Sequence, residues 1–179
     1  MSDLPPPPPP PPSEPPPEPP WPSPGSPAGQ LVPVGPWPRF GARIIDGLVL
    51  FIPNAIFAAV LTDESASSFG GVGTGENFVY VLVSTLLGFA YAVWLEASRG
   101  QTLGKMALGY KVVGPDGQIP SNDVAMRRNA WLLLGLVPIV GGVLSFVAAV
   151  AIGVTIANDP FKRGTHDNFA GGSAVVRSR

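Results

Sequence analysis

The sequence feature that most constrains the fold is the nearly unbroken apolar run Arg39–Leu61, which contains one acidic residue. About 23 residues of helix, at roughly 1.5 Å per residue, extend about 34 Å, which is enough to cross a hydrocarbon core of about 30 Å. Asp46 lies about two turns into this run, where an ionised carboxylate costs roughly 2.5–3.5 kcal/mol if it reaches the bilayer centre. Such a side chain is expected to face protein or trapped water rather than lipid.

Arg43 lies three residues before Asp46, so the two side chains are neighbours on one face of the predicted helix. A rotation of about 100° per residue places Asn54 on the same polar stripe. Two roles remain open for Asp46: an ion pair or hydrogen bond that locks helix packing, with Arg43 as the near partner, or a proton or cation ligand on a transport path. Asn54 is expected to form hydrogen bonds between helices.

The composition also favours a membrane protein. Charged residues make up 13% of the chain, whereas soluble domains contain about 25%. The net charge of -1 argues against a nucleic-acid partner, which would require clustered basic surface. There is no cysteine, and the one histidine, His166, leaves little scope for a histidine metal site. We therefore predict no metal, no cofactor and no enzymatic activity.

Two further apolar segments follow the first. Phe78–Leu95 is just long enough to span a bilayer. Ala130–Ala157, interrupted by Pro138, is too long for one upright span and too short for two, so it forms either a tilted, kinked helix or two half-helices that dip into the bilayer. The predicted fold is an all-α membrane protein, a small polytopic helical bundle in contact with lipid, with hydrophobic segments at about 40–61, 78–95 and 130–157.

An amphiphilic region, Gly100–Asn129, joins the second and third segments. Within it, Lys111–Pro120 carries a Pro-Asp-Gly turn between two short apolar runs, which predicts a small cytoplasmic hairpin. Lys105 is expected to anchor the chain at the membrane interface. Glu96, at the end of the second segment, is a supporting polar position.

The distribution of basic residues predicts the orientation. Basic residues precede the first segment and follow the second, whereas the loop Thr62–Asn77 has none. By the positive-inside bias, the N-terminus and Gly100–Asn129 are expected in the cytoplasm of a multi-pass cell-membrane protein. The basic segment Asn158–Arg179 would also prefer the cytoplasm, but three crossings would place it outside. The path of the third segment therefore stays open.

Nineteen of the 24 prolines lie within Met1–Pro38. This composition favours an extended, disordered tail at residues 1–38, followed by a membrane domain at 39–178. The tail is interpreted as a spacer, with docking to an SH3-like or WW-like cytoplasmic partner as the alternative.

Three blocks carry a resemblance to a known family. They are GARIIDG in the first segment, GQTLGKMALGYKVVGPDGQIP after the second, and RGTHDNFAGGSAVV near the end. In this order they resemble the RDD family of prokaryotic membrane proteins, named for one arginine and two aspartates, which Arg43, Asp46 and Asp167 would match. The resemblance implies an integral membrane protein of largely uncharacterised role, with transport of unknown ligands proposed and cation/proton exchange suggested for some members. It supplies no catalytic residues.

Two classes of function are therefore carried forward. The first is a small transporter or ion exchanger that uses the Arg43/Asp46 pair. Such a protein is expected to act as a homo-oligomer, because two or three helices alone cannot enclose a transport path. The second is a structural or adaptor module whose tail recruits a cytoplasmic partner. Asp167, beside His166, is expected to brace the C-terminal turn or to pair with a basic residue beneath the bundle.

Overall fold

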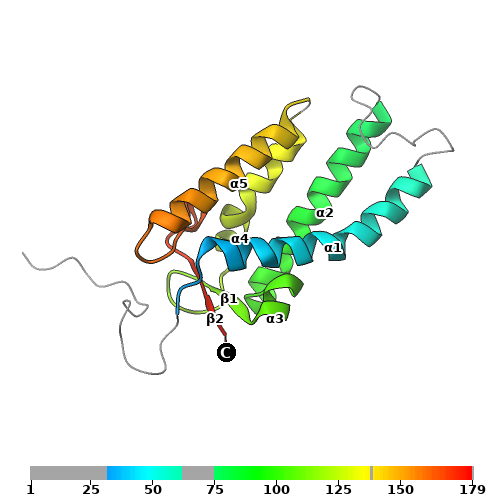
Figure 1. The fold of residues 1–179 in the computed structure, drawn as a ribbon. Helices are drawn as coiled ribbons and strands as arrows, with labels where there is room; N and C mark the ends of the chain where they lie inside the picture. The colour runs from blue at the N-terminus through cyan, green and yellow to red at the C-terminus, as the bar shows by residue number, and fades with distance from the viewer. Residues whose placement is uncertain (1–31, 62–74, 138, 179) are drawn as a thin grey trace, which may run out of the picture.

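The computed structural model describes residues 32–61, 75–137 and 139–178 (Figure 1). The tail at residues 1–31 and most of the basic-free loop lie outside the described residues. The described part is mainly helical, with one small sheet. Its elements are α1 (Pro36–Leu61), α2 (Gly75–Arg99), α3 (Leu103–Leu108), β1 (Tyr110–Val113), α4 (Asn122–Asn129), the 3-10 helix η1 (Ala130–Leu136), α5 (Gly141–Asn158), α6 (Thr165–Phe169) and β2 (Ala174–Arg177).

Three helices are long and apolar enough to cross a membrane: Pro36–Ala59 of α1, Phe78–Arg99 of α2 and Gly141–Asn158 of α5. Their outer faces carry exposed large apolar side chains, such as Phe146 on α5 and Ile52 on α1. Such faces suit contact with lipid, where all backbone groups are satisfied within the helices. The predicted all-α membrane fold is therefore confirmed.

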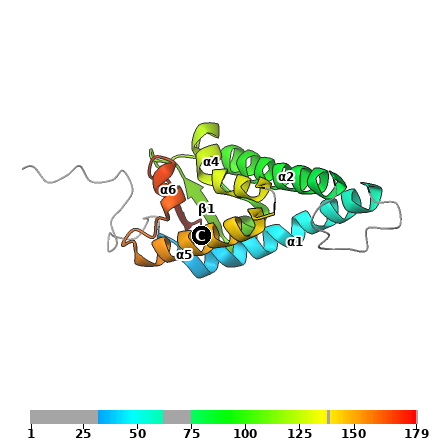
Figure 2. The same ribbon diagram turned by 90° about the horizontal axis from the view of Figure 1, so that it is seen from above.

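The third hydrophobic segment is divided into two parts that pack against each other. The helix η1 ends at Leu136, and Ile139 has a φ of 68° before α5 begins. The turn is tight, since a Cβ on Gly141 would lie 2.5 Å from the carbonyl oxygen of Gly135. η1 lies next to α2 and α5 next to α1 (Figure 2). Of the two paths left open by the sequence, the single kinked helix is not observed, because the chain turns back between Leu136 and Gly141. With 18 residues, however, α5 is longer than the expected half-helix. We call η1 and α5 together the helical hairpin.

A two-stranded antiparallel sheet lies at one end of the bundle. β1 pairs with β2 from Tyr110↔Arg177 to Val113↔Ala174, and Pro33 forms a bridge to Val176 on the other side. The segments before α1, after α2 and after α5 therefore meet at the same end (Figure 1). We call this polar end, residues 32–35, 100–129 and 159–178, the cap.

The predicted local hairpin at Lys111–Pro120 is corrected by this pairing. The turn forms, because Gly114 donates its N–H to the carbonyl of Gln118 at 2.8 Å. The strand before it pairs with β2, about 65 residues away, and not with the residues after the turn. Pro120 has no N–H to donate to a ladder, so the residues after the turn are a poor second strand.

The ordered domain begins before the predicted boundary at residue 38. Val34 is buried against Val112 and Val175 of the sheet, and α1 starts at Pro36, which suits the first turn of a helix. Asn54 also differs from its expected role, since its Nδ2 donates to the carbonyl of Leu50 in the same helix at 2.8 Å and not to a neighbouring helix. Pro53 lacks an N–H and loosens the helix at this point.

Candidate functional site

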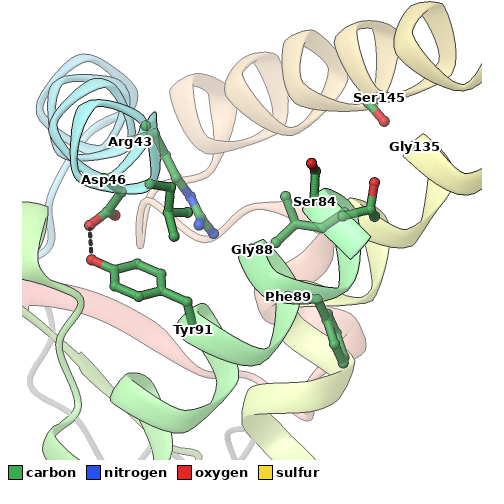
Figure 3. Close-up of a pocket in the computed structure, with 12 residues that line it drawn as sticks. Arg43, Asp46, Ser84, Gly88, Phe89, Tyr91, Gly135 and Ser145 are labelled. Carbon is green, nitrogen blue, oxygen red and sulfur yellow. Dashed lines mark hydrogen bonds between the residues drawn. The ribbon is translucent and has the colours of Figure 1, made fainter. Parts of the chain in front are cut away.

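Asp46 lies on the inner face of α1 and is only 3% exposed. Its Oδ1 accepts hydrogen bonds from the Tyr91 hydroxyl at 2.8 Å and from the N–H of Gly104 at 2.7 Å. Its Oδ2 accepts one from the Thr102 hydroxyl at 2.7 Å. Figure 3 shows the hydroxyl of Tyr91 directed at this carboxylate. Three donors from α2 and the start of α3 thus offset the cost of burying the charge.

Arg43 has different partners from Asp46. Its Nη2 donates to Oδ1 of Asn129 at 2.8 Å, and its guanidinium lies 5.7 Å from the ring centroid of Trp131. Within the described part of the chain, no ion pair joins Arg43 to Asp46. The ion pair with Arg43, one of the two roles left open for Asp46, is therefore not formed. Helical spacing makes the two side chains neighbours, but Asp46 bonds to α2 and the start of α3, whereas Arg43 bonds to Asn129 at the end of α4.

Glu96, at the cap end of α2, is fully buried and joins three elements. It forms an ion pair with Lys105 and lies 3.2 Å from Nε of Arg128. It also accepts a hydrogen bond from Nδ2 of Asn129 at 2.9 Å. Lys105 is 4% exposed, so the predicted interface anchor is a buried ion-pair partner. Burial lowers the pKa of Lys105 to about 8, and the opposing effect of Glu96 offsets this only in part.

Asp167, on α6, is a fully buried carboxylate within the cap. It lies 2.6 Å from Nη1 of Arg39 and also pairs with Arg128, and it accepts the N–H of Gly164 at 2.9 Å. Burial acts to raise the pKa of Asp167, but Arg128, His166 and Arg39 outweigh it and hold the pKa well below its usual range. Asp167 therefore caps α6 and ties it to α1 and α4, in agreement with the expected brace.

His166 lies beside this carboxylate and is neutral near pH 7. Burial lowers the pKa of His166 to about 3, since the attraction of Asp167 is opposed by the charges of Arg128, Arg39 and Arg43. Its Nδ1 has no hydrogen-bond partner. The nearby Ser173 donates its hydroxyl to Oδ1 of Asp167 at 3.4 Å and accepts a hydrogen bond from Nη1 of Arg128 at 2.9 Å. The described residues contain no group of three or more His, Asp or Glu side chains that could hold a metal ion.

These side chains form one continuous network. Asn129 links Arg43 to Glu96, and Arg128 links Glu96 to Asp167. Sequence reasoning singled out Arg43, Glu96, Lys105 and Asp167, which belong to this network, and Asp46, which is held separately by Tyr91, Thr102 and Gly104. Sequence reasoning missed Arg39 and Arg128, because basic residues beside a predicted span were interpreted only as orientation signals. It also did not single out Tyr91, Thr102 and Asn129, whose partners lie far away in the sequence.

A cavity of about 300 Å³ lies between α1, α2, η1 and α5, directly above this network. Arg43 and Asp46 form its cap end, while Ser84 on α2 and Ser145 on α5 form the far end (Figure 3). The hydroxyl oxygens of both serines are buried without a hydrogen-bond partner. Much of the remaining wall is apolar, with Leu50 among its side chains. The cavity therefore lies between helices of spanning length. It combines the cation of Arg43, the hydrogen-bonded carboxylate of Asp46 and the two hydroxyls without partners.

Comparison with known proteins agrees with this architecture. The chain matches the family described as RDD family over residues 33–171. It is also similar to an uncharacterized protein, YxaI, of Bacillus subtilis (strain 168), with 29% identity over 152 residues that cover 75% of this chain and 91% of the relative. No solved structure matches the chain.

Proposed function

The chain belongs to the RDD family of membrane proteins, and from this premise we propose that it moves a small solute across the cell membrane by way of the cavity between α1, α2, η1 and α5. The observation that carries the proposal is that this cavity, within helices of spanning length, contains Arg43 and two buried hydroxyls without partners. Unpaired buried polar groups are costly, so they are retained where they serve a ligand.

The orientation of the protein is part of this proposal. The three segments that form the cap are joined by backbone hydrogen bonds, and therefore lie on one side of the bilayer. They contain most of the Lys and Arg residues that flank the spans, including Lys111, Arg127 and Lys162. The positive-inside bias then assigns the cap and the start of α1 to the cytoplasm. Three crossings would have placed the basic C-terminal segment outside the cell. The helical hairpin of η1 and α5 avoids this, because it returns the chain to the side from which it entered.

The transport path needs an opening toward the other side of the membrane. The cavity begins at the cap network and extends toward Ser84, which lies about 15 residues, or roughly 22 Å, from the cap end of α2. We propose that a second copy of the chain completes the path, since the apolar outer faces of α1 and α5 are free to pack against another protomer.

Cation/proton exchange at Asp46 has less support than transport of another solute. A cation ligand needs carboxylate oxygens that face the cavity, whereas those of Asp46 accept from Tyr91, Thr102 and Gly104. The positive charge of Arg43 lines the same cavity and would repel a cation. The adaptor alternative depends on residues 1–31, which are outside the described structure.

The test is solute flux into proteoliposomes that contain the purified full chain. Uptake of radiolabelled acetate, of nitrate and of sodium ions is measured for the wild type, Ser84→Leu and Ser98→Leu. Ser84→Leu fills the cavity, whereas Ser98 is an exposed residue of the same helix whose hydroxyl donates to Trp94. We expect uptake of at least one solute by the wild type and by Ser98→Leu, and its loss in Ser84→Leu. Uptake equal to that of empty liposomes for every solute would reject the proposal.

A further inference from the structure

Four basic side chains, Arg39, Arg43, Lys105 and Arg128, and three acidic ones, Asp46, Glu96 and Asp167, lie at the cap end of the spans. Arg43 is half-buried, and the other six are buried. A cation that lacks an anionic partner in such surroundings marks a position at which an ion of opposite sign would be stabilised.

Arg43 is the basic residue of this group that has no carboxylate partner in the described structure. Arg39 pairs with Asp167, Arg128 lies against both Asp167 and Glu96, and Lys105 pairs with Glu96. Arg43 instead has the neutral amide of Asn129 and the face of Trp131. A guanidinium has five N–H donors in a planar fork, and the contact with Asn129 occupies only part of them. Arg43 therefore retains donors and a charge for a further partner.

The cavity lies where such a partner would bind. Figure 3 shows the Arg43 side chain extending from α1 into the space in front of α2, toward Gly88. Ser84 and Ser145 line the far end, and their hydroxyls, which lack partners, can each donate a hydrogen bond. Gly88 and Gly135 have no side chains to fill the space between.

The shape and the remaining charges limit the class of ligand. The volume of about 300 Å³ is at the lower end for small-molecule sites, so the ligand is small. Asp46 lines the same cavity, and its negative charge disfavours a second negative charge on the ligand. The apolar side chains of Leu50, Phe89 and Leu132 form much of the wall and suit a short hydrocarbon group. A planar carboxylate matches the guanidinium fork in two hydrogen bonds.

We propose that the cavity binds a short-chain monocarboxylate, with the carboxylate on Arg43 and the hydrocarbon group against the apolar wall. The assignment rests on the proposed function, because it names the ligand class of the same cavity. It does not require Asp46 to change its protonation state or its partners.

The test is the binding of propionate to the purified full chain in nanodiscs, measured by isothermal titration calorimetry and by the melting temperature, with sodium sulfate as background salt. Propionamide has the same size without the charge, and nitrate has a planar charged group without the hydrocarbon. We expect saturable propionate binding and a higher melting temperature, at least about tenfold weaker binding of nitrate, and no binding of propionamide.

Three variants make the test specific. Arg43→Gln removes the charge, Ser145→Leu fills the cavity and leaves Arg43 in place, and Arg99→Gln makes the same charge change at the exposed end of α2. We expect propionate affinity to fall at least about tenfold in the first two and to stay unchanged in Arg99→Gln. If Arg43→Gln does not fold, the propionate affinity of Ser145→Leu tests the proposal on its own. Equal binding of propionate by folded Ser145→Leu and wild type, or equal binding of propionate and propionamide, would overturn the proposal.

The ligand assignment and the transport function fail in different ways. Propionate binding without uptake in proteoliposomes supports the assignment and rejects transport. Uptake of sodium or nitrate without saturable propionate binding supports transport and rejects the assignment.

Discussion

The backbone N–H of Gly104 donates a 2.7 Å hydrogen bond to Oδ1 of Asp46 and so joins the first turn of α3 to the middle of α1. The two backbones approach so closely that a Cβ on Gly104 would overlap the carbonyl oxygen of Ala42. The small residues Ala42 and Gly104 permit this contact, as at helix interfaces in membranes. The carboxylate at the centre of the site is thus positioned by a backbone contact that only glycine allows.

Gly104→Ala is therefore expected to separate α3 from α1. The new methyl group meets backbone atoms of Ala42, which cannot move aside as a flexible side chain would. We expect destabilisation by at least about 1–3 kcal/mol, measured as a lower melting temperature of the detergent-solubilised protein. Gly153→Ala on α5 is the control, since a Cβ there has no neighbour within 4 Å. Similar melting temperatures for the two variants would contradict the close packing.

Asp46 is expected to be coupled energetically to Tyr91 more strongly than to Arg43. In a double-mutant cycle of Asp46→Asn with Tyr91→Phe, the hydrogen bond between them should appear as a coupling energy of about 0.5–3 kcal/mol. The cycle of Asp46→Asn with Arg43→Gln should give a smaller value, because Arg43 bonds to Asn129. Melting temperatures of the three single variants, the two double variants and the wild type supply both cycles. A larger coupling energy with Arg43 would instead support a direct interaction between Arg43 and Asp46.

His166 is expected to make the stability of the cap sensitive to acid. Its pKa is about 3 in the folded protein, because of burial, against an ordinary value of about 6.5. Between these two values the unfolded chain binds the proton and the folded chain does not, so stability is full above about pH 6.5 and falls as the pH drops toward 3. The melting temperature of the wild type should decrease from pH 6.5 to pH 4. The decrease should be smaller in His166→Gln, which does not titrate. An equal decrease in the melting temperatures of His166→Gln and the wild type would show that His166 does not cause the acid sensitivity.

The hairpin of η1 and α5 predicts the side on which the C-terminus lies. The chain contains no cysteine, so single cysteines can be introduced without a background. In intact cells an impermeant maleimide should label a cysteine at Ser67 and should not label one at Ser178, which lies next to the sheet of the cap. Both should be labelled after the cells are opened. Labelling of Ser178 in intact cells would mean that the third segment crosses the membrane completely.

The amino-acid sequence by itself determined the class of this protein and its local structure. Hydropathy is summed along the chain, so the runs Arg39–Leu61 and Phe78–Leu95 are sufficient to predict α1 and α2. The cost of a buried carboxylate likewise marks Asp46 from its position alone. The break in the third segment was also visible in its proline and glycines, although the direction of the chain after the break was not.

Only the tertiary structure decided which groups meet. Helical spacing relates residues three or four apart, whereas Asp46 bonds to Gly104, 58 positions away, and Arg39 to Asp167, 128 positions away. The partner strand of β1 is β2, which follows α5 in the chain. This pairing is possible because α5 returns the chain to the cap. Each of these outcomes requires the packing of several helices at once, because the free energy of a buried charge depends on the donors that surround it and not on its neighbours along the chain.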